Sequence, residues 1–267
     1  MDWESLYCPN RRCRYYGRPF LQGLLVKNGS SHGQKQARCQ ACETPVSIRY
    51  GTAYLELHTD PAIFEMAVRA LAEGNSIRAT ARIVQVDKDA VCTWLDRAAQ
   101  HCRLVMLYLW RNLHVIECQL DELWSFVHTK PHQLPLARLY DDTYGDAWVW
   151  VAFAPVWRLV VAFVIGKRTQ QSANVLLDRV LHVTDAHMPF FTSDQLPEYR
   201  RALLHAYGMW HQPPRQGKRG RYPKPRLMPP PGLLYAQVVK TRDHGRIVQV
   251  ESKVVFGDPQ AIAEKLT

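Results

Sequence analysis

The chain has 267 residues, enough for two or three small domains or one large one, and its 47% hydrophobic content excludes a disordered protein. Its 34 Lys and Arg exceed its 24 Asp and Glu, and a net charge of +10 suits a polyanionic partner, nucleic acid first and an anionic membrane surface second. The chain starts without the apolar core of a secretion signal, so we expect a cytoplasmic protein.

Four cysteines form two close pairs, Cys8-x4-Cys13 and Cys39-x2-Cys42. Two pairs separated by a loop are what a tetrahedral four-cysteine zinc site needs, and the metal would be the main source of stability for so short a segment. We therefore predict a zinc ribbon over residues 1–55, with Zn²⁺ as a structural cofactor. The alternative is four unrelated thiols.

Basic residues surround these cysteines in the sequence. They form either an ordinary solvated face or a set of phosphate contacts. They are Arg11, Arg12, Arg14, Lys27, Lys35, Arg38 and Arg49.

Residues 56–108 predict three helices. Asp60 caps the first, which stops at Gly74; the second begins at Asn75, and Asp87 caps the third. This order is typical of a helix-turn-helix domain whose last helix enters the major groove of DNA, although bundles of three helices also serve other functions.

The third helix divides into two faces. Its apolar stripe is expected to face the core and consists of Val91, Trp94, Leu95, Ala98 and Cys102. Cys92 is likewise interpreted as a small core residue. The opposite face is predicted to bind DNA through Lys88, Asp89, Thr93 and Arg97.

Residues Ala147–Gly166 are almost all apolar and long enough to cross a membrane. Pro155, Arg158 and the β-branched composition argue instead for two buried strands joined by a turn at Ala154–Val156. We therefore expect no membrane partner.

The segment His114–Val127 predicts one buried strand that carries Asp121 among apolar residues. A carboxylate there costs several kcal/mol unless a metal or hydrogen bonds compensate it. Two strands, a helix over Gln171–Leu181, a strand ending at Asp194 and a helix from Pro197 follow. The expected fold is therefore multidomain α/β, in which a ribonuclease-H-like domain over residues 109–267 pairs the two Asp-bearing strands.

Phosphoryl transfer on DNA uses two divalent ions about 3.5–4 Å apart, held by carboxylates. We predict that Asp121 bridges two Mg²⁺ or Mn²⁺ ions and that Asp194 is the second ligand; a helix cap is the alternative for Asp194. Glu122 faces the other side of the strand and is the less favoured ligand. Three later acids are candidates for a third ligand, but the position of each on a helix or an exposed strand is also explained without a metal. They are Glu198, Glu251 and Glu264.

The last part of the chain combines a cationic segment with regular structure. Residues 212–232 hold seven prolines and six Lys or Arg, which predicts an extended, flexible arm. A hairpin that turns at Asp243-His244-Gly245 and a helix over Pro259–Leu266 follow.

The cysteine pairs, NSIRATARIVQVDKDAVCTWL, QLDELWSFV, IGKRT and FFTSDQLPEY together resemble the insertion-sequence transposases typified by insertion sequence one. The resemblance implies a DDE transposase that binds terminal inverted repeats of double-stranded DNA as a homo-oligomer in the nucleoid, and that cleaves and transfers strands. It places Asp121 and Asp194 on the first two catalytic acids. The third acid of this family follows the hairpin, beyond Thr267, so we expect a C-terminally truncated, incomplete catalytic domain.

Two other functions remain open at this point. The chain could be a DNA-binding relic or regulator that occupies the ends of the element without cutting them. It could also be a ribonuclease-H-type nuclease.

Overall fold

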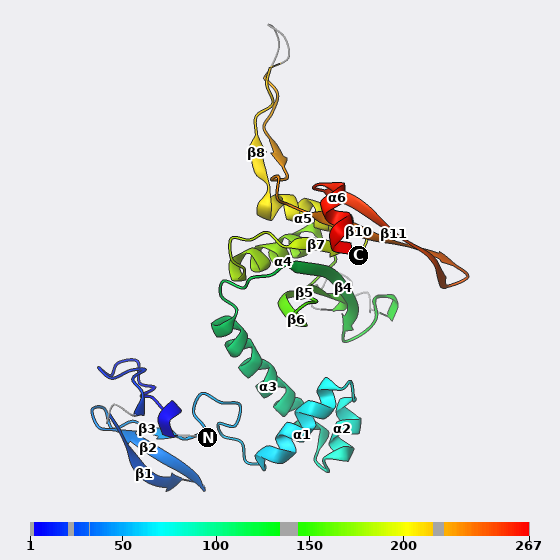
Figure 1. Ribbon diagram of the computed structural model, residues 1–267. Coiled ribbons are helices and arrows are strands. Elements are labelled where there is room, and N and C mark those ends of the chain that lie inside the picture. The colour runs from blue at the N-terminus through cyan, green and yellow to red at the C-terminus, as the bar shows by residue number, and fades with distance from the viewer. Residues whose placement is uncertain (1–2, 21–23, 32, 134–143, 216–221, 267) are drawn as a thin grey trace. The chain divides into compact units, whose positions relative to one another are not determined.

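The computed structural model describes residues 3–20, 24–31, 33–133, 144–215 and 222–266 (Figure 1). The chain divides into two compact units, Met1–Tyr108 and Leu109–Thr267. This division falls at the start that the sequence analysis gave to the last domain. Within the described residues, no helix combines the length and the hydrophobicity needed to cross a membrane.

The first unit begins with a small antiparallel sheet in the order β1-β2-β3. Its elements are the 3₁₀ turn η1 (Trp3–Ser5) and the strands β1 (Leu25–Ser31), β2 (Gln34–Cys39) and β3 (Pro45–Ser47). A small core forms beneath the sheet from Leu6, Cys8, Leu25, Ala37, Cys39 and Val46. Two of the four paired cysteines therefore belong to this core.

Three helices follow: α1 (Pro61–Ala72), α2 (Ile77–Ile83) and α3 (Lys88–Leu109). Asp60 caps α1 by accepting a hydrogen bond from the backbone of Ala62, and Asp87 accepts one from the backbone of Asp89, as predicted. Helix α2 begins at Ile77, two residues later than the predicted start at Asn75, and its cap is Ser76, whose hydroxyl accepts from the backbone of Ala79 at 3.2 Å. Phe64 and Trp94 meet edge to face in the core between the helices.

The predicted core stripe of α3 is wrong in its second half. Val91 and Trp94 are buried and Ala98 is half-buried, but Leu95, Cys92 and Cys102 are exposed. The reason is length: α3 has 22 residues, whereas α1 and α2 have 12 and 7. The short helices cover only the start of α3. The apolar residues further along α3 keep the helical period, but no described element of this unit packs against them.

The second unit is a mixed sheet with helices. Its strands run in the order β11-β10-β7-β4-β5-β6, with antiparallel pairing within β4-β5-β6 and β10-β11 and parallel pairing of β7 with β4 and β10. Its elements in chain order are β4 (Glu117–Val127), the 3₁₀ turn η3 (Pro131–Gln133), β5 (Gly145–Ala154), β6 (Leu159–Gly166), α4 (Gln170–Val183), β7 (Phe190–Ser193), α5 (Pro197–Tyr207), β8 (Met209–His211), β9 (Arg226–Met228), β10 (Tyr235–Asp243), β11 (Arg246–Phe256) and α6 (Pro259–Leu266).

The apolar run that imitates a membrane span forms two strands, β5 and β6, as predicted, but β6 is buried on one face only, since Val160, Phe163 and Ile165 are exposed. The turn between them covers residues 155–158, and the backbone of Arg158 donates to the carbonyl of Pro155. Arg158 has φ +51°, so the chain reverses through a left-handed residue. Both strands are rich in β-branched and aromatic residues, which suit a pleated surface.

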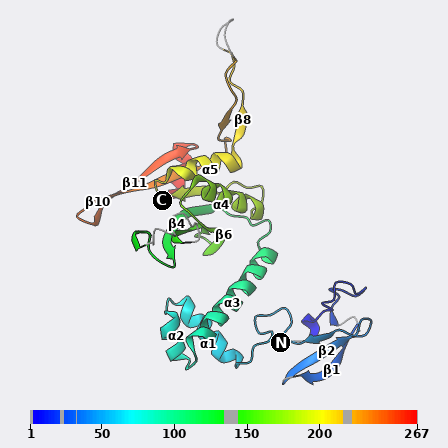
Figure 2. The same cartoon turned by 180° about the vertical axis from the view of Figure 1, so that it is seen from behind.

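Helices α4 and α5 cover one face of the sheet (Figure 2). Leu176 and Val180 of α4 are fully buried there, and Trp150 of β5 meets Tyr199 of α5 edge to face. Leu181, the last residue of the predicted helix, is 44% exposed, whereas Leu177 is fully buried in the core. The 3.6-residue period allows both positions at the edge of the stripe, and only packing against the sheet selects one of them.

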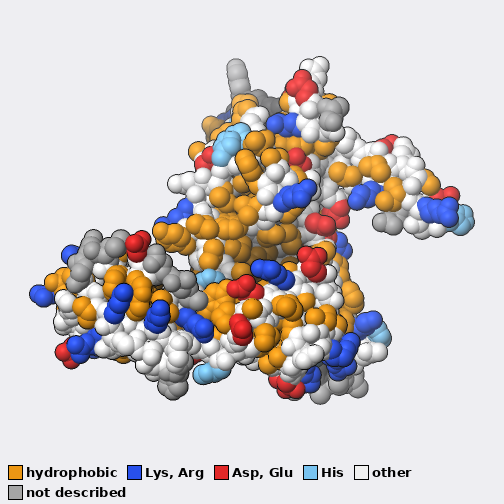
Figure 3. Space-filling view, turned by 60° about the horizontal axis from the view of Figure 1, so that its bottom comes forward, with side chains coloured by type: hydrophobic (Ala, Val, Ile, Leu, Met, Phe, Trp, Pro, Cys, Tyr) orange, Lys and Arg blue, Asp and Glu red, His pale blue; other side chains and the backbone are white. Residues whose placement is uncertain are grey.

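The opposite face of β4, β5 and β6 is apolar and open. Phe163 and Ile165 of β6 are exposed on it, the latter by 66%, and Leu123 of β4 by 58%. Figure 3 shows hydrophobic side chains gathered on this side of the second unit. The prediction of one buried strand over His114–Val127 is therefore wrong beyond Leu120, because burial needs a covering layer as well as apolar residues.

The proline-rich segment over residues 212–232 is partly regular. Strand β9 pairs with β8 in antiparallel register, so this part of the predicted arm is extended as expected but is held by backbone hydrogen bonds rather than flexible. Residues 216–221 lie outside the described part of the chain. The hairpin β10–β11 turns at His244 and Gly245, which have φ +46° and +80°, and the terminal helix α6 packs Ile262 against Phe190.

The packing of α4 gives a first prediction. Leu176→Ala should lower the free energy of unfolding by about 2–5 kcal/mol, because it leaves a cavity under the sheet. Leu181→Ala, an identical change one turn further along the helix, should change it by less than about 0.5 kcal/mol. Urea unfolding followed by circular dichroism measures both. Equal losses would contradict the inward face described above.

Candidate functional site

The thiols of Cys8, Cys13, Cys39 and Cys42 lie together, with all four sulfur atoms within 4.8 Å of one another. The Sγ atoms of Cys8 and Cys42 are 3.6 Å apart, and those of Cys13 and Cys39 are 3.9 Å apart. A tetrahedral zinc ion with Zn–S bonds of about 2.3 Å would separate its sulfur ligands by about 3.8 Å. The cluster therefore has the dimensions of a metal site and could bind an ion such as zinc.

Tight turns bring each cysteine pair together. The carbonyl of Cys8 accepts from the backbone of Gly17, whose φ of +71° suits glycine. In the second pair, the carbonyl of Cys39 accepts from the backbone of Glu43 at 2.9 Å. These hydrogen bonds form within the chain, so the sulfur atoms are already gathered by the backbone.

Two thiols of the cluster have opposite proton affinities. Burial raises the pKa of Cys8 to about 12. Hydrogen bonding to the side chain and backbone of Thr44 lowers the pKa of Cys42 to about 6. A cation ligated by all four sulfurs would favour the thiolate at each of them, which offsets the cost of burial at Cys8.

Asp121 and Asp194 follow the last paired residues of two neighbouring strands in the middle of the sheet. The parallel register of β4 and β7 ends with Leu120 opposite Ser193, and each Asp is the next residue. Asp121 alternates with Glu122, so it faces away from α4 and α5, whereas Asp194 lies just beyond the end of β7, where its charge acts on Glu122 and Arg168. The expectation that the two strands are neighbours is confirmed.

The environment of Asp121 differs from the expected one. Its carboxylate is exposed and accepts a hydrogen bond from the backbone of Glu122 at 2.8 Å. Asp194 is exposed as well, and its Oδ1 accepts from the backbone of Leu196 at 3.0 Å, at the entrance to α5. The argument from a costly buried acid is therefore wrong for Asp121.

The buried carboxylate is Glu122, on the opposite face. Its side chain is 3% exposed, and its two oxygens accept from Arg168 at 2.5 Å and from the Tyr199 hydroxyl at 2.9 Å. Burial is the largest cause that raises the Glu122 pKa, and the charge of Asp194 raises it further, against the effect of Arg168. The alternation of β4 placed Glu122 on the face away from Asp121, but nothing in the sequence indicated that this carboxylate is the buried one.

The three acids weighed as a third ligand have different positions. Glu198 is in the first turn of α5, where its charge reaches Arg168. Glu251 is exposed on β11 and accepts from Gln249, and Glu264 is on α6. Among the described residues, the four cysteines form the only group of three or more His, Cys, Asp or Glu ligand atoms close enough for one ion.

Of the predicted DNA-contacting residues of α3, Lys88, Asp89 and Thr93 are exposed and Arg97 is half-buried, and all four have partners within the chain. Lys88 pairs with Asp89 at 2.7 Å, and the Thr93 hydroxyl donates to the carbonyl of Asp89. Arg97 donates to the carbonyl of Leu55, which ties α3 to the segment before α1. Arg97 therefore has a structural role that its position on the helix did not indicate.

No model of a known protein family matches the chain, and a search of curated proteins finds no match.

The sulfur geometry predicts about one zinc ion per chain, because a single set of four thiols is present. Cys39→Ser should lose this metal and unfold the β1–β3 sheet, since Cys39 is also a core residue. Metal analysis by mass spectrometry and circular dichroism measure the two effects. Cys92→Ser is the matched control, because Cys92 is exposed on α3, and it should retain the metal. A protein without bound metal would contradict the assignment.

The burial of Glu122 predicts a pH effect. Its pKa is raised in the folded protein, so its contribution to the free energy of unfolding is present below the ordinary carboxyl pKa and is lost as pH rises through the raised value. The difference in stability between wild type and Glu122→Gln should therefore fall as the pH rises above the ordinary carboxyl pKa of 4.5. Urea unfolding at a series of pH values measures it. Glu251→Gln, at an exposed site, should give a flat difference, and a rise for Glu122→Gln would contradict the sign.

Proposed function

We propose that the chain is a DNA-binding transposase of the DDE type, which cuts and joins DNA at the Asp121–Asp194 site of its sheet. The observation that supports this proposal is the register of β4 and β7, which ends one residue before Asp121 on one strand and one residue before Asp194 on the other. The strand order β6-β5-β4-β7-β10, with three antiparallel strands followed by two parallel ones, supports a ribonuclease-H-like domain.

The donor set fits a hard divalent cation. Each Asp uses one oxygen for a backbone hydrogen bond, and within the described residues the second oxygen of each has no hydrogen-bond donor. Exposed carboxylate oxygens are the ligands that Mg²⁺ and Mn²⁺ prefer. Asp121 and Asp194 would hold the ion, and the ion would supply charge stabilisation at the phosphate that is cut.

The roles of the chain's own residues follow from their contacts. Glu122 fastens the end of β4 to Arg168 and Tyr199, so it positions Asp121 without contacting substrate. Arg168 is half-exposed beside this site and stacks on Trp148 at 4.7 Å, and it still has donors for a DNA phosphate. Preorganised side chains of this kind lower the cost of placing a phosphate at the two acids.

The first unit would deliver DNA to this site. Helices α1, α2 and α3 have the order of a helix-turn-helix, and α2 exposes Arg78 and Arg82. In the view of Figure 3, Lys and Arg side chains are exposed on the surface of the first unit. Cations on exposed helix faces contact phosphates and supply affinity, whereas base contacts from α3 would supply specificity.

A second candidate function is a DNA-binding regulator that does not cut. It is favoured by one observation: Glu122, the acid nearest to Asp121 in sequence, is engaged by Arg168 and Tyr199 on the other face. A third ligand for the metal would then have to come from elsewhere.

Nicking of DNA tests the proposal. A labelled duplex from the DNA that flanks the coding sequence should be nicked by the wild-type chain in Mg²⁺ or Mn²⁺. Asp121→Asn and Asp194→Asn should each lower this activity by at least about a hundredfold. Mutation of residues that only support a metal ligand can already cost about a hundredfold, and these two residues would be ligands themselves. Both side chains are exposed, so folding should be unaffected.

Asp178→Asn is the control for that experiment, because Asp178 is a half-exposed acid on α4. It should leave nicking unchanged. Binding of the duplex without any nicking would favour the regulator, and full nicking by Asp121→Asn would rule out the proposed site.

A further inference from the structure

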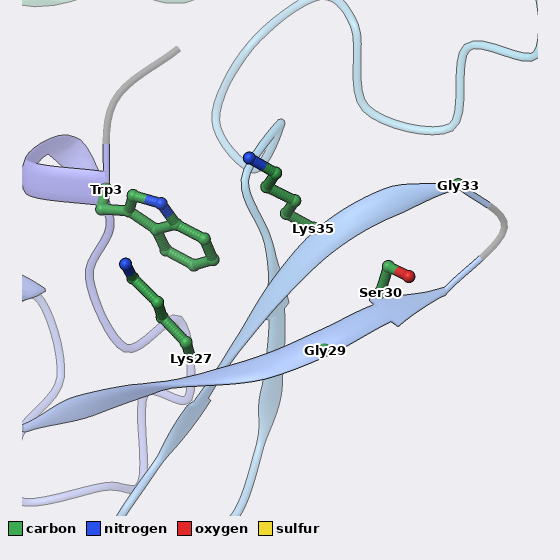
Figure 4. Close-up of a pocket in the computed structure, with 6 residues that line it drawn as sticks. All are labelled: Trp3, Lys27, Gly29, Ser30, Gly33 and Lys35. Carbon is green, nitrogen blue, oxygen red and sulfur yellow. The ribbon is translucent and has the colours of Figure 1, made fainter.

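A hollow of about 480 Å³ lies on the β1–β2 hairpin of the first unit (Figure 4). Within the described residues, its lining contains an indole, two ammonium groups and a hydroxyl, together with two glycines, and no acid. The lining residues are Trp3, Lys27, Gly29, Ser30, Gly33 and Lys35. Neither the cysteine cluster nor the Asp121–Asp194 site contributes a residue to it.

The hairpin register explains how these groups come together. Lys27 pairs with Ala37, and Lys35 is two residues from Ala37 on the same strand, so both lysines leave the same face of the hairpin. Figure 4 shows Trp3 and both lysines on that side. The register shifts between Lys27 and Ser30, where Gly29 has φ +65°. A glycine is suited to this backbone conformation and leaves the floor of the hollow free of a side chain.

Trp3 is held as a platform. One side of its ring packs against Phe20, with 5.7 Å between the ring centroids, and the Nζ of Lys27 lies 5.3 Å from the Trp3 ring. Trp3 is half-buried, so part of the indole remains accessible. Among the described residues, neither Lys27 nor Lys35 forms an ion pair, and two uncompensated cations beside an indole favour an anionic ligand that also has a ring.

We propose that this hollow binds single-stranded nucleic acid, with one unpaired base stacked on Trp3 and the flanking phosphates bound by Lys27 and Lys35. Every base has a face that can stack on an aromatic ring, and stacking requires that the base is unpaired. Two separate lysines can each bind one phosphate. A strand has two such phosphates, whereas a nucleoside monophosphate has only one. The inference rests on the proposed function only in taking DNA as the nucleic acid.

This site would add a property that helices α1–α3 do not supply. A helix in the major groove reads paired bases, whereas an indole platform detects a strand that has opened or ended. In a protein that cuts DNA, such a platform would hold a frayed or displaced end.

Fluorescence anisotropy with a labelled twelve-nucleotide oligo(dT) tests the proposal on the full, zinc-loaded chain. Trp3→Ala should weaken binding roughly fivefold to a hundredfold, whereas Trp3→Phe, which keeps a ring, should retain most of the affinity. Lys27→Gln and Lys35→Gln should each reduce the slope of log K against log salt by about 0.7, the value for one phosphate of a single strand. Binding of a blunt duplex should be unaffected by Trp3→Ala.

Lys240→Gln and Lys253→Gln are charge-matched controls, because both lysines are exposed on the β10–β11 hairpin of the second unit. They should leave the slope for oligo(dT) unchanged. The proposal is overturned if these controls lower the slope as much as Lys27→Gln does, or if Trp3→Phe and Trp3→Ala bind alike. It is also overturned if thymidine monophosphate competes as well as the oligonucleotide.

Zinc content and the unfolding transition show whether each variant is folded. If Trp3→Ala is not, Trp3→Phe and the two lysine variants carry the test. The outcome is separable from the proposed function: a chain that binds oligo(dT) through Trp3 but never nicks DNA keeps this site and loses the transposase proposal. A Trp3→Ala chain that nicks DNA normally and binds oligo(dT) as tightly as wild type keeps the transposase proposal and loses this site.

Discussion

The parallel pairing of β4 with β7 is the contact on which the second unit depends. It joins the antiparallel group β4-β5-β6 to the group β7-β10-β11, in which β7 and β10 are parallel and β10 and β11 are antiparallel. Cys118 of β4 and Phe191 of β7 are paired and fully buried at the seam, so α4 and α5 pack against a continuous surface. The same register ends one residue before Asp121 and one residue before Asp194. The buried pairs of the seam therefore determine where along the sheet the two acids lie.

A second constraint acts on the reverse side of that point. Glu122 is a carboxylate buried against a helix layer, which costs free energy unless its oxygens are satisfied. Arg168, just before α4, and Tyr199 of α5 satisfy them, so a single side chain connects β4 to both helices. Removing either partner would leave charge buried without compensation, and the strand that carries Asp121 would lose its fixed position. Burial of this kind on one face can therefore support exposed chemistry on the other.

The sequence predicted local structure better than burial. Asp60 and Asp87 marked helix starts, and Pro155 separated two strands, because capping and backbone restrictions act within a few residues. The stripe on α3 and the second half of β4 were predicted to be buried and are not, because periodicity identifies a face without showing that anything covers it. The cluster of Glu122, Arg168 and Tyr199 could not be predicted, since its members are 46 and 77 residues from Glu122 and meet only after the sheet forms.

The cysteine cluster and the basic hollow are two consequences of one hairpin. Cys39 ends β2 opposite Leu25, and Lys27 lies two residues further along β1. Closing the thiols around an ion fixes this end of the β1–β2 register, and the register in turn places Lys27 beside Trp3 and on the same face as Lys35. A sheet of three short strands with so small a core has little other stability, so the geometry of its surface cations depends on the cluster. If the cluster binds a metal and the hollow binds a strand as proposed, the two sites would be linked through backbone register, although they share no residue.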